Sequence, residues 1–312
     1  MPAPVPPTAP RPLDGVGDSY VLVTAAKNEA DNIVRTVESV LAQTVPPDRW
    51  VIVDDGSIDG TFELAELATA GHSAVTVLRR PTGAPDDFAS KVRAIHTGTE
   101  AIGDIRHDLI GHLDADVSMA PTYFEQLLER FATRPRLGIA GGLIVEEHHG
   151  RLREQRISTN SVAGAVQLFR RACYDQIDGV RPLRLGGEDA AAEILARMHG
   201  WEVETFFDLR VRHHGRVLNR KRTSVGAWFA RGIVNRTLGY SPSFQLGVCA
   251  YRATQPPYLL GGGCMLAGYV AAMVRGVPVE LPPEAVAFLR TEQRNRLRQA
   301  LIAPWKSCVT AR

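Results

Sequence analysis

Two aspartates one residue apart, Asp114 and Asp116, follow a mostly apolar run at residues 109–113. Such a run is typical of a buried strand, and an unpaired charge inside a core costs several kcal/mol. We therefore expect both carboxylates at the carboxyl end of this strand, facing a cleft. There they could hold a hard divalent cation, which bridges the oxygens of a substrate diphosphate. A solvated turn is the alternative, because Asp is common in turns.

Two more acids, Asp54 and Asp55, directly follow a second apolar run at residues 50–53. The carboxyl ends of parallel strands lie at one edge of a sheet, and ligands of such sheets bind at that edge. Acids at the ends of two neighbouring strands therefore favour a shared site over a coincidence of turns.

The elements that must position these acids alternate in type along the first part of the chain. Apolar runs predict strands at 20–26, 50–53, 74–78 and 109–113, and helical spacing predicts helices at 33–43, 62–68 and 91–102. This order is typical of a parallel sheet covered by helices on both faces. Further along we expect a helix at 121–131, a glycine-spaced strand at 137–145, a strand pair within 156–169, helices at 170–177 and 190–199, and a strand at 201–207.

Composition restricts the class of protein only broadly. The chain has 312 residues, of which 45% are hydrophobic and 22% charged, as in an ordinary globular protein. A net charge of +2 gives no indication of a nucleic-acid partner, and we expect none. The four cysteines are far apart and form no C-x-x-C pair, which favours reduced thiols and a cytoplasmic location over a disulfide framework or a zinc site.

Three regions differ in character: a proline-rich leader at 1–17, which we expect to be disordered, a catalytic domain at 18–222, and a helical extension at 223–312. In the extension, the uncharged run at 258–274 is shorter than the ~20 residues of a membrane span, which favours a buried or re-entrant helix or a subunit interface. The basic helix predicted at 283–302 could lie on an anionic membrane, or pack on the domain or on a second subunit.

Five short motifs occur in a fixed order: AAKNE at 25–29, VDDGSIDGT at 53–61, LDAD at 113–116, GGED at 186–189 and VRH at 211–213. Together they resemble the family 2 glycosyltransferases of the GT-A fold, over about residues 20–216. The resemblance implies an α/β protein of GT-A architecture, with a Rossmann-like, mostly parallel central sheet, helices on both faces and a helical C-terminal extension. It also implies an enzyme of the hexosyltransferase type.

Carried over by position, the resemblance implies a nucleotide-sugar donor that lies across the strand ends. Ala25, Lys27 and Glu29 would line the nucleotide pocket, although relatives usually carry an aromatic residue where Lys27 stands. Asp54 would accept a hydrogen bond from the base, and Lys91 would lie against the nucleotide.

The same resemblance implies a Mg²⁺ or Mn²⁺ site built on the Asp-x-Asp motif. Asp116 would ligate the cation, and Asp114 would touch the ribose or the metal. Two adjacent histidines in a strand point to opposite faces, so only one of His213 and His214 can complete the site. The family's Val-x-His pattern selects His213.

Asp189 is the candidate general base, because an inverting transfer needs a carboxylate that takes the proton of the attacking hydroxyl. Glu188 would orient the acceptor or the donor. The alternative is a turn whose acids favour a helix N-terminus. Arg216 opens a basic run that could clamp the diphosphate as a mobile loop, or could be a solvated basic loop.

These observations predict a metal-dependent, inverting glycosyltransferase that moves a sugar from a nucleoside-diphosphate sugar to an acceptor hydroxyl. A UDP-sugar is favoured over a GDP- or dTDP-sugar, and the acceptor is either lipid-linked or a small metabolite. The alternatives are a retaining GT-A glycosyltransferase and a non-catalytic nucleotide-sugar-binding or scaffold protein. The location is cytoplasmic, with homo-oligomer formation or peripheral membrane contact through the C-terminal helices left open. A nucleotidyltransferase and a dinucleotide oxidoreductase are disfavoured, because residues 24–29 contain no glycine.

Overall fold

A computed structural model describes residues 19–81, 89–148, 151–155, 157–214 and 225–302. The described residues form two compact units, one within 1–184 and 188–215 and the other within 185–187 and 216–312. The predicted disordered leader at 1–17 and the predicted clamp residue Arg216 lie outside the described residues.

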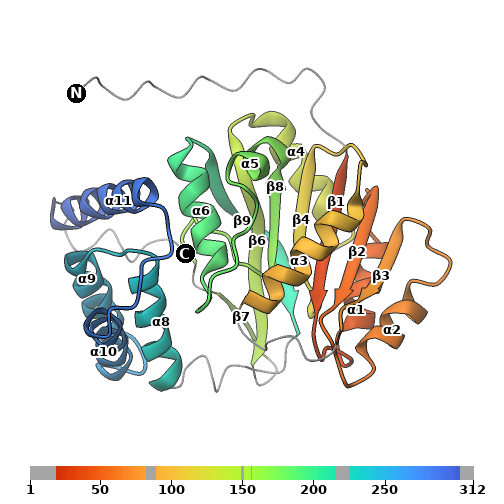
Figure 1. The fold of residues 1–312 in the computed structure, drawn as a ribbon. Coiled ribbons are helices and arrows are strands. Elements are labelled where there is room, and N and C mark those ends of the chain that lie inside the picture. Colours follow the sequence, from red (N-terminus) through yellow and green to blue (C-terminus); the bar gives the residue numbers. More distant parts are fainter. Residues whose placement is uncertain (1–18, 82–88, 149–150, 156, 215–224, 303–312) are drawn as a thin grey trace. The chain divides into compact units, whose positions relative to one another are not determined.

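The first unit is built on a nine-stranded sheet, and its first four strands are parallel. They lie in the order β3-β2-β1-β4 (Figure 1). Their bounds are β1 Tyr20–Ala26, β2 Arg49–Asp54, β3 Val75–Arg79 and β4 Leu109–Asp114. In this half of the sheet the predicted alternation of strands and helices along the chain is confirmed. Parallel strands need a long crossover connection, which here is a helix each time.

The other half of the sheet mixes directions. β8 is antiparallel to both β4 and β6, and β6 is parallel to β9. β5 pairs with β9 and β7 with β6, both antiparallel. The bounds are β5 Val117–Met119, β6 Leu137–His148, β7 Arg151–Glu154, β8 Val166–Arg170 and β9 Glu202–His213.

One predicted element is wrong in detail. The strand pair expected within 156–169 is a single strand, β8, while its expected companion is β7, which precedes that range. β7 has the sequence Arg-Leu-Arg-Glu and, among the strands that the structure describes, pairs with β6 alone. An edge strand of this kind has charged side chains and lacks the apolar alternation by which a strand is recognised.

Helices cover both faces of the parallel half, and the alternation of side chains along β1 shows how. Tyr20 and Leu22 belong to a buried cluster with residues of α1 and α4, such as Ile33 and Phe124. The alternate residues of β1, Val21 and Val23, point to the opposite face of the sheet. On that face Gly98 of α3 lies against Val23. The helices of this unit are α1 Ile33–Leu41, α2 Thr61–Ala68, α3 Ala89–Ile102, α4 Tyr123–Thr133, α5 Arg171–Gln176 and α6 Glu188–Met198.

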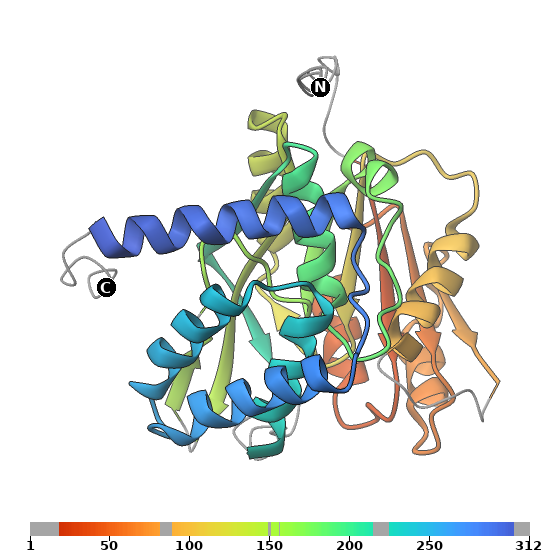
Figure 2. The ribbon, with the colours of Figure 1, turned by 60° about the vertical axis from the view of Figure 1, so that its left-hand side comes forward.

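The second unit is helical, as the sequence predicts. Its helices are α8 Val225–Thr237, α9 Pro242–Ala253, α10 Leu260–Val274 and α11 Pro283–Ile302 (Figure 2). Ser241 begins α9 by accepting a hydrogen bond from the backbone of Phe244 at 3.3 Å. Across the part of the chain that the structure describes, no helix combines the length and apolar character needed to cross a bilayer.

Candidate active site

The Asp-x-Asp motif lies where the parallel strands end. Asp114 is the last residue of β4, and Asp116 lies in the turn between β4 and β5. Strand β1 separates β4 from β2, with Ala25 opposite Asp114 and Ala26 opposite Asp54. Two strand spacings separate β2 from β4, or about 10 Å, so both acids lie on one edge of the sheet.

Lys91 of α3 reaches the first acid of the motif. Its ammonium lies 2.5 Å from Asp114 Oδ1, and 3.4 Å from the carbonyl oxygen of Gly164. Burial alone lowers the pKa of Lys91, but the charges of Asp114, Glu188 and Asp189 outweigh burial and raise it. Lys91 therefore keeps its positive charge among these three carboxylates.

The loop at Gly164 and Ala165 contacts both the Asp-x-Asp motif and the predicted base, Asp189. The backbone N–H of Asp114 donates to the carbonyl of Ala165 at 2.9 Å, and the adjacent Gly164 lies directly against the Asp189 side chain. A Cβ at Gly164 would stand 3.1 Å from Asp189 Oδ2. Asp114, Lys91 and Asp189, which are far apart in sequence, therefore surround the same short loop.

Asp116 and His213 form a second pair, with 3.3 Å between Asp116 Oδ2 and His213 Nε2. Burial and the charge of Asp114 raise the pKa of Asp116, while His213 and Lys91 oppose that rise. The neighbouring His214 faces elsewhere, since its Nε2 lies 2.7 Å from Ser118 Oγ. Only the imidazole of His213 is therefore directed toward the motif.

Glu29 lies close enough to the motif to sense its charge. Burial raises the pKa of Glu29 to about 7, and the charges of Asp116 and Asp114 add to the rise against a hydrogen bond from Asn32. The other residues predicted for the nucleotide pocket in this segment, Ala25 and Lys27, are half-buried at the end of β1.

Asp54 and Asp55 hold their own surroundings together. Asp54 is 1% exposed, accepts the backbone N–H of Ser57 at 3.3 Å and lies 3.5 Å from Arg79 Nε. Asp55 accepts from Arg80 and from Ser90 Oγ at 2.5 Å each. Asp55 thus ties the end of β2 to the beginning of α3, the helix that carries Lys91. The sequence feature that accompanies the Asp55–Arg80 contact is the Arg79-Arg80 pair at the end of the neighbouring strand β3.

Glu188 and Asp189 open α6, and Asp189 Oδ1 accepts the backbone N–H of Ala190 at 2.7 Å. Burial raises the pKa of Glu188, and the charge of Asp189 adds to the rise. The structure adds Glu193, which sequence reasoning missed. It is 4% exposed and accepts from Ser161 Oγ at 3.1 Å and from the backbone of Val162 at 2.7 Å. Its spacing of four residues from Asp189, on one helix face, was the available signal.

Comparison with known proteins identifies the family. Residues 21–193 match the family model described as Glycosyl transferase family 2. The chain belongs to this family. This glycosyltransferase is 29% identical in sequence to the succinoglycan biosynthesis protein ExoU of Rhizobium meliloti (strain 1021) over 220 residues. The aligned region covers 61% of this chain and 59% of ExoU. The glycosyltransferase AglE of Haloferax volcanii is 26% identical over 170 residues, or 50% of this chain and 52% of AglE. The chain thus spans between half and two thirds of these relatives.

Solved structures show that the glycosyltransferase has the predicted GT-A fold. The mannosyltransferase PcManGT from Pyrobaculum calidifontis, in complex with GDP-Man and Mn²⁺, matches with a TM-score of 0.54 and 17% identity, covering 96% of this chain and 87% of that one. GalNAc-T7 with UDP, GalNAc and Mn²⁺ matches with a TM-score of 0.61 and 14% identity, covering 94% of this chain and 59% of that one.

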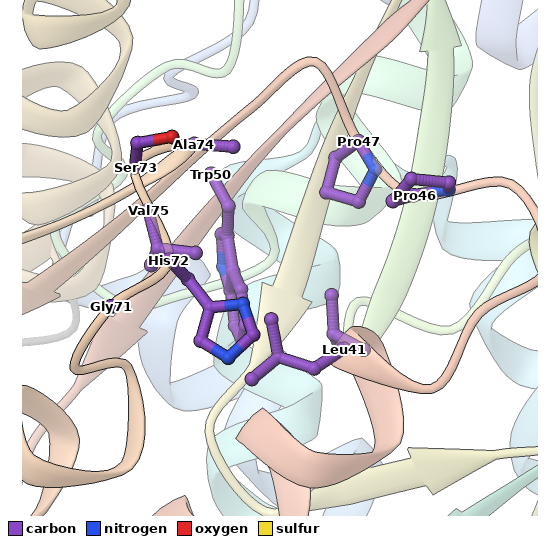
Figure 3. Close-up of a pocket in the computed structure, with 10 residues that line it drawn as sticks. Leu41, Pro46, Pro47, Trp50, Gly71, His72, Ser73, Ala74 and Val75 are labelled. Carbon is purple, nitrogen blue, oxygen red and sulfur yellow. The ribbon is translucent and has the colours of Figure 1, made fainter.

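A cavity of about 270 Å³ lies at the opposite end of β2 and β3 of the glycosyltransferase (Figure 3). It is lined by residues at the amino ends of these strands, including Trp50 and Val75, together with His72 and Leu41. Asp54 is four residues further along β2 than Trp50, or about 13 Å at the usual rise of a strand. The cavity is therefore separate from the acids at the carboxyl edge.

Glu193 predicts a pH dependence of stability in the glycosyltransferase. Burial raises the pKa of Glu193 from 4.5 to about 7, so its stabilising contribution is full below pH 4.5 and is lost as the pH rises through 7. From pH 5 to pH 8, the wild type should lose about 2–3 kcal/mol more unfolding free energy than Glu193→Gln. Denaturant unfolding at both pH values measures this difference. The exposed Glu38→Gln variant should follow the wild type, and identical pH profiles for wild type and Glu193→Gln would contradict the prediction.

Proposed function

We propose that this glycosyltransferase is metal-dependent and inverting, and that it moves a sugar from a nucleoside-diphosphate sugar to an acceptor hydroxyl. The observation that carries the proposal is the convergence of Asp114, Asp116, Lys91 and Asp189 around one edge of the sheet. A cation and an ammonium can stabilise the charge that develops on the leaving diphosphate, and a carboxylate base can take the proton of the acceptor hydroxyl.

The residues at the motif fit a divalent cation in part. An oxygen of Asp116 and a nitrogen of His213 lie close enough together to be ligands of one cation. An oxygen of Asp114 could be a further ligand if its ion pair with Lys91 were broken. Within the described ranges, no three His, Cys, Asp or Glu side chains gather closely enough to hold a metal alone. We propose that these residues hold Mg²⁺ or Mn²⁺ together with the donor diphosphate, whose oxygens are hard ligands suited to either ion. Bound there, the metal supplies positive charge beside the leaving phosphate.

Lys91 has two roles in this proposal. In the free enzyme its ammonium balances Asp114 and keeps the motif's charge from accumulating. When the donor binds, the same ammonium lies beside the diphosphate, where departure of the nucleotide builds negative charge. Ala25, Lys27, Glu29 and Asp54 would line the nucleotide pocket, and Arg216, outside the described residues, would clamp the diphosphate.

Asp189 supplies the acceptor side. Its carboxylate would take the proton of the acceptor hydroxyl while that oxygen forms a bond to the anomeric carbon. The bond from the anomeric carbon to the phosphate oxygen breaks in the same step, and its electron pair leaves with the nucleoside diphosphate. Attack opposite to the leaving group inverts the anomeric configuration. Glu188 would orient one of the two sugars.

The donor and setting are further parts of the proposal. The comparison structures hold GDP-Man in one case and UDP in the other, which supports a nucleotide-sugar donor in general. We favour a UDP-sugar over a GDP- or dTDP-sugar, an acceptor hydroxyl on a lipid-linked or small molecule, and a cytoplasmic location. We also propose residues 18–222 as the catalytic domain, with 223–312 as an extension.

A donor panel tests this function. The full chain is incubated with UDP-, GDP- and dTDP-sugars in Mn²⁺, in Mg²⁺ or in EDTA, and release of the nucleoside diphosphate is measured. We expect release from one class of donor, its loss in EDTA, and a product whose anomeric configuration by NMR is opposite to that of the donor. A product of the donor's configuration would favour a retaining enzyme, and no release from any donor would favour a non-catalytic binding protein.

A further inference from the structure

Helix α10 has an exposed face without a charged or polar side chain. None of its residues, Leu260–Val274, is charged. Its exposed positions recur every three or four residues and so form one stripe along the helix, comprising Leu260, Gly263, Ala267, Val270, Met273 and Val274. Val274 is 78% exposed and Leu260 is 62% exposed.

The opposite face of α10 packs within its own unit at very short range. Gly268 lies against the backbone carbonyl of Phe229 in α8, and Gly262 lies against that of Cys249 in α9. A side chain at either glycine would collide with these carbonyls, so both glycines are needed for the close packing of the helices. The inner face of α10 is thus packed against α8 and α9, and the apolar stripe lies on the opposite, outer face.

Exposed apolar side chains also occur directly before the first residue of α10. Tyr258 and Leu259, directly before α10, are 65% and 75% exposed. We call the six stripe residues together with Tyr258 and Leu259 the α10 surface. A contiguous apolar surface of this kind marks a contact with a partner or a membrane, whereas single exposed apolar residues need no explanation.

The charge of the sequence segment that contains α10 indicates the kind of partner. The sequence contains no Asp or Glu from Leu209 to Val279, although it holds 34 of them in 312 residues. All charged residues of this segment are basic, and among them Arg275 directly follows the stripe while Arg231 is exposed on α8, which packs against α10. Apolar side chains with arginines and without acids complement an anionic phospholipid surface, where each basic residue adds to binding.

We propose that the α10 surface binds the headgroup region of an anionic phospholipid bilayer, with α10 lying in the plane of the membrane. α10 has 15 residues, or about 22 Å, which is shorter than the ~30 Å hydrocarbon core. A helix of this length with one apolar face is suited to lie in the interface. The proposal is independent of the sugar-transfer chemistry, because it involves none of the residues placed in that site.

Vesicle flotation of the purified full chain tests the proposal. The probes are vesicles of phosphatidylcholine alone and of phosphatidylcholine with 30% phosphatidylglycerol. We expect flotation with the anionic vesicles, at least about tenfold weaker binding to the neutral ones, and weakening in 0.5 M salt. The Val270→Asp/Val274→Asp variant should lose at least tenfold in binding to anionic vesicles, since it charges the stripe. Arg231→Gln/Arg275→Gln should lose binding selectively for the anionic vesicles.

Leu67→Asp is the matched control, because Leu67 is 75% exposed on α2 in the other unit. It should bind vesicles as the wild type does, and all variants should keep the wild-type circular dichroism spectrum. Equal flotation of the wild type and Val270→Asp/Val274→Asp would overturn the proposal, as would absence of flotation with anionic vesicles. A dimer in light scattering that Val270→Asp/Val274→Asp abolishes, with no vesicle binding, would overturn it in favour of a second copy of the chain.

Discussion

Replacing Asp189 with Asn is expected to lower the turnover of sugar transfer by roughly 10²- to 10⁴-fold, the range of a general base. Asn keeps the size of the side chain and can still accept the backbone N–H of Ala190, so the start of α6 should be unchanged. It cannot take the proton of the attacking hydroxyl. The measurement is the release of nucleoside diphosphate from the donor that the panel identifies, with separate values for kcat and KM.

Asp208→Asn is the matched control for this loss. Asp208 is an exposed carboxylate that pairs with Arg130 at 2.8 Å. It should keep wild-type turnover, and Asp189→Asn should bind the nucleoside diphosphate as tightly as the wild type. If Asp189→Asn kept more than a tenth of the wild-type kcat, no acceptor-side base would be needed and a retaining transfer would be favoured.

Replacing Asp116 with Asn is expected to weaken Mn²⁺-dependent binding of the nucleoside diphosphate on the order of 10²-fold or more. Even groups that only support a metal ligand change metal affinity 10- to 100-fold, and the proposal makes Asp116 a direct ligand. Calorimetric titration of nucleoside diphosphate into protein with Mn²⁺ measures the change in Kd.

The two histidines provide an internal comparison for the same titration. His213→Gln should resemble Asp116→Asn, because His213 Nε2 is the nitrogen directed at Asp116. His214→Gln should change Kd less than about threefold, because His214 bonds Ser118 instead. Strong weakening by His214→Gln alone would show that the wrong histidine has been placed in the site.

The sequence predicted the parallel half of the fold well, because its strands are short apolar runs that end at polar residues. β1 was predicted with its bounds, Tyr20–Ala26. The strand predicted at 109–113 was expected to end at the two acids, and β4 does end at Asp114, with Asp116 in the turn that follows. The strand β5 was not predicted, because a strand of three residues, Val117–Met119, is too short to show a periodic pattern. β7 was missed because it is a charged edge strand.

The acids of the site could be predicted as a group, but their partners could not. Sequence position placed Asp54 and Asp114 at strand ends, with no means to tell that Arg79 and the turn at Ser57 engage Asp54 while Lys91 engages Asp114. These partners depend on how α3 and the strand β3 lie against the sheet. Glu193 likewise acquires its role from the backbone of residues 161–162, which carries no sequence motif.

In the proposed function, carboxylates distant in the sequence act on one cation and on the diphosphate that it neutralises. Thermal unfolding of the full chain with Mn²⁺, with a nucleoside diphosphate and with both measures whether the cation and the diphosphate bind together. A ligand at about 100 times its Kd stabilises the folded state by about 2.7 kcal/mol, which corresponds to a rise of about 4 °C in Tm for a chain of 312 residues. We predict this rise for one of UDP, GDP and dTDP, only when Mn²⁺ is present, and its loss in Asp116→Asn. A rise that is the same in EDTA, or the same in Asp116→Asn, would contradict the claim.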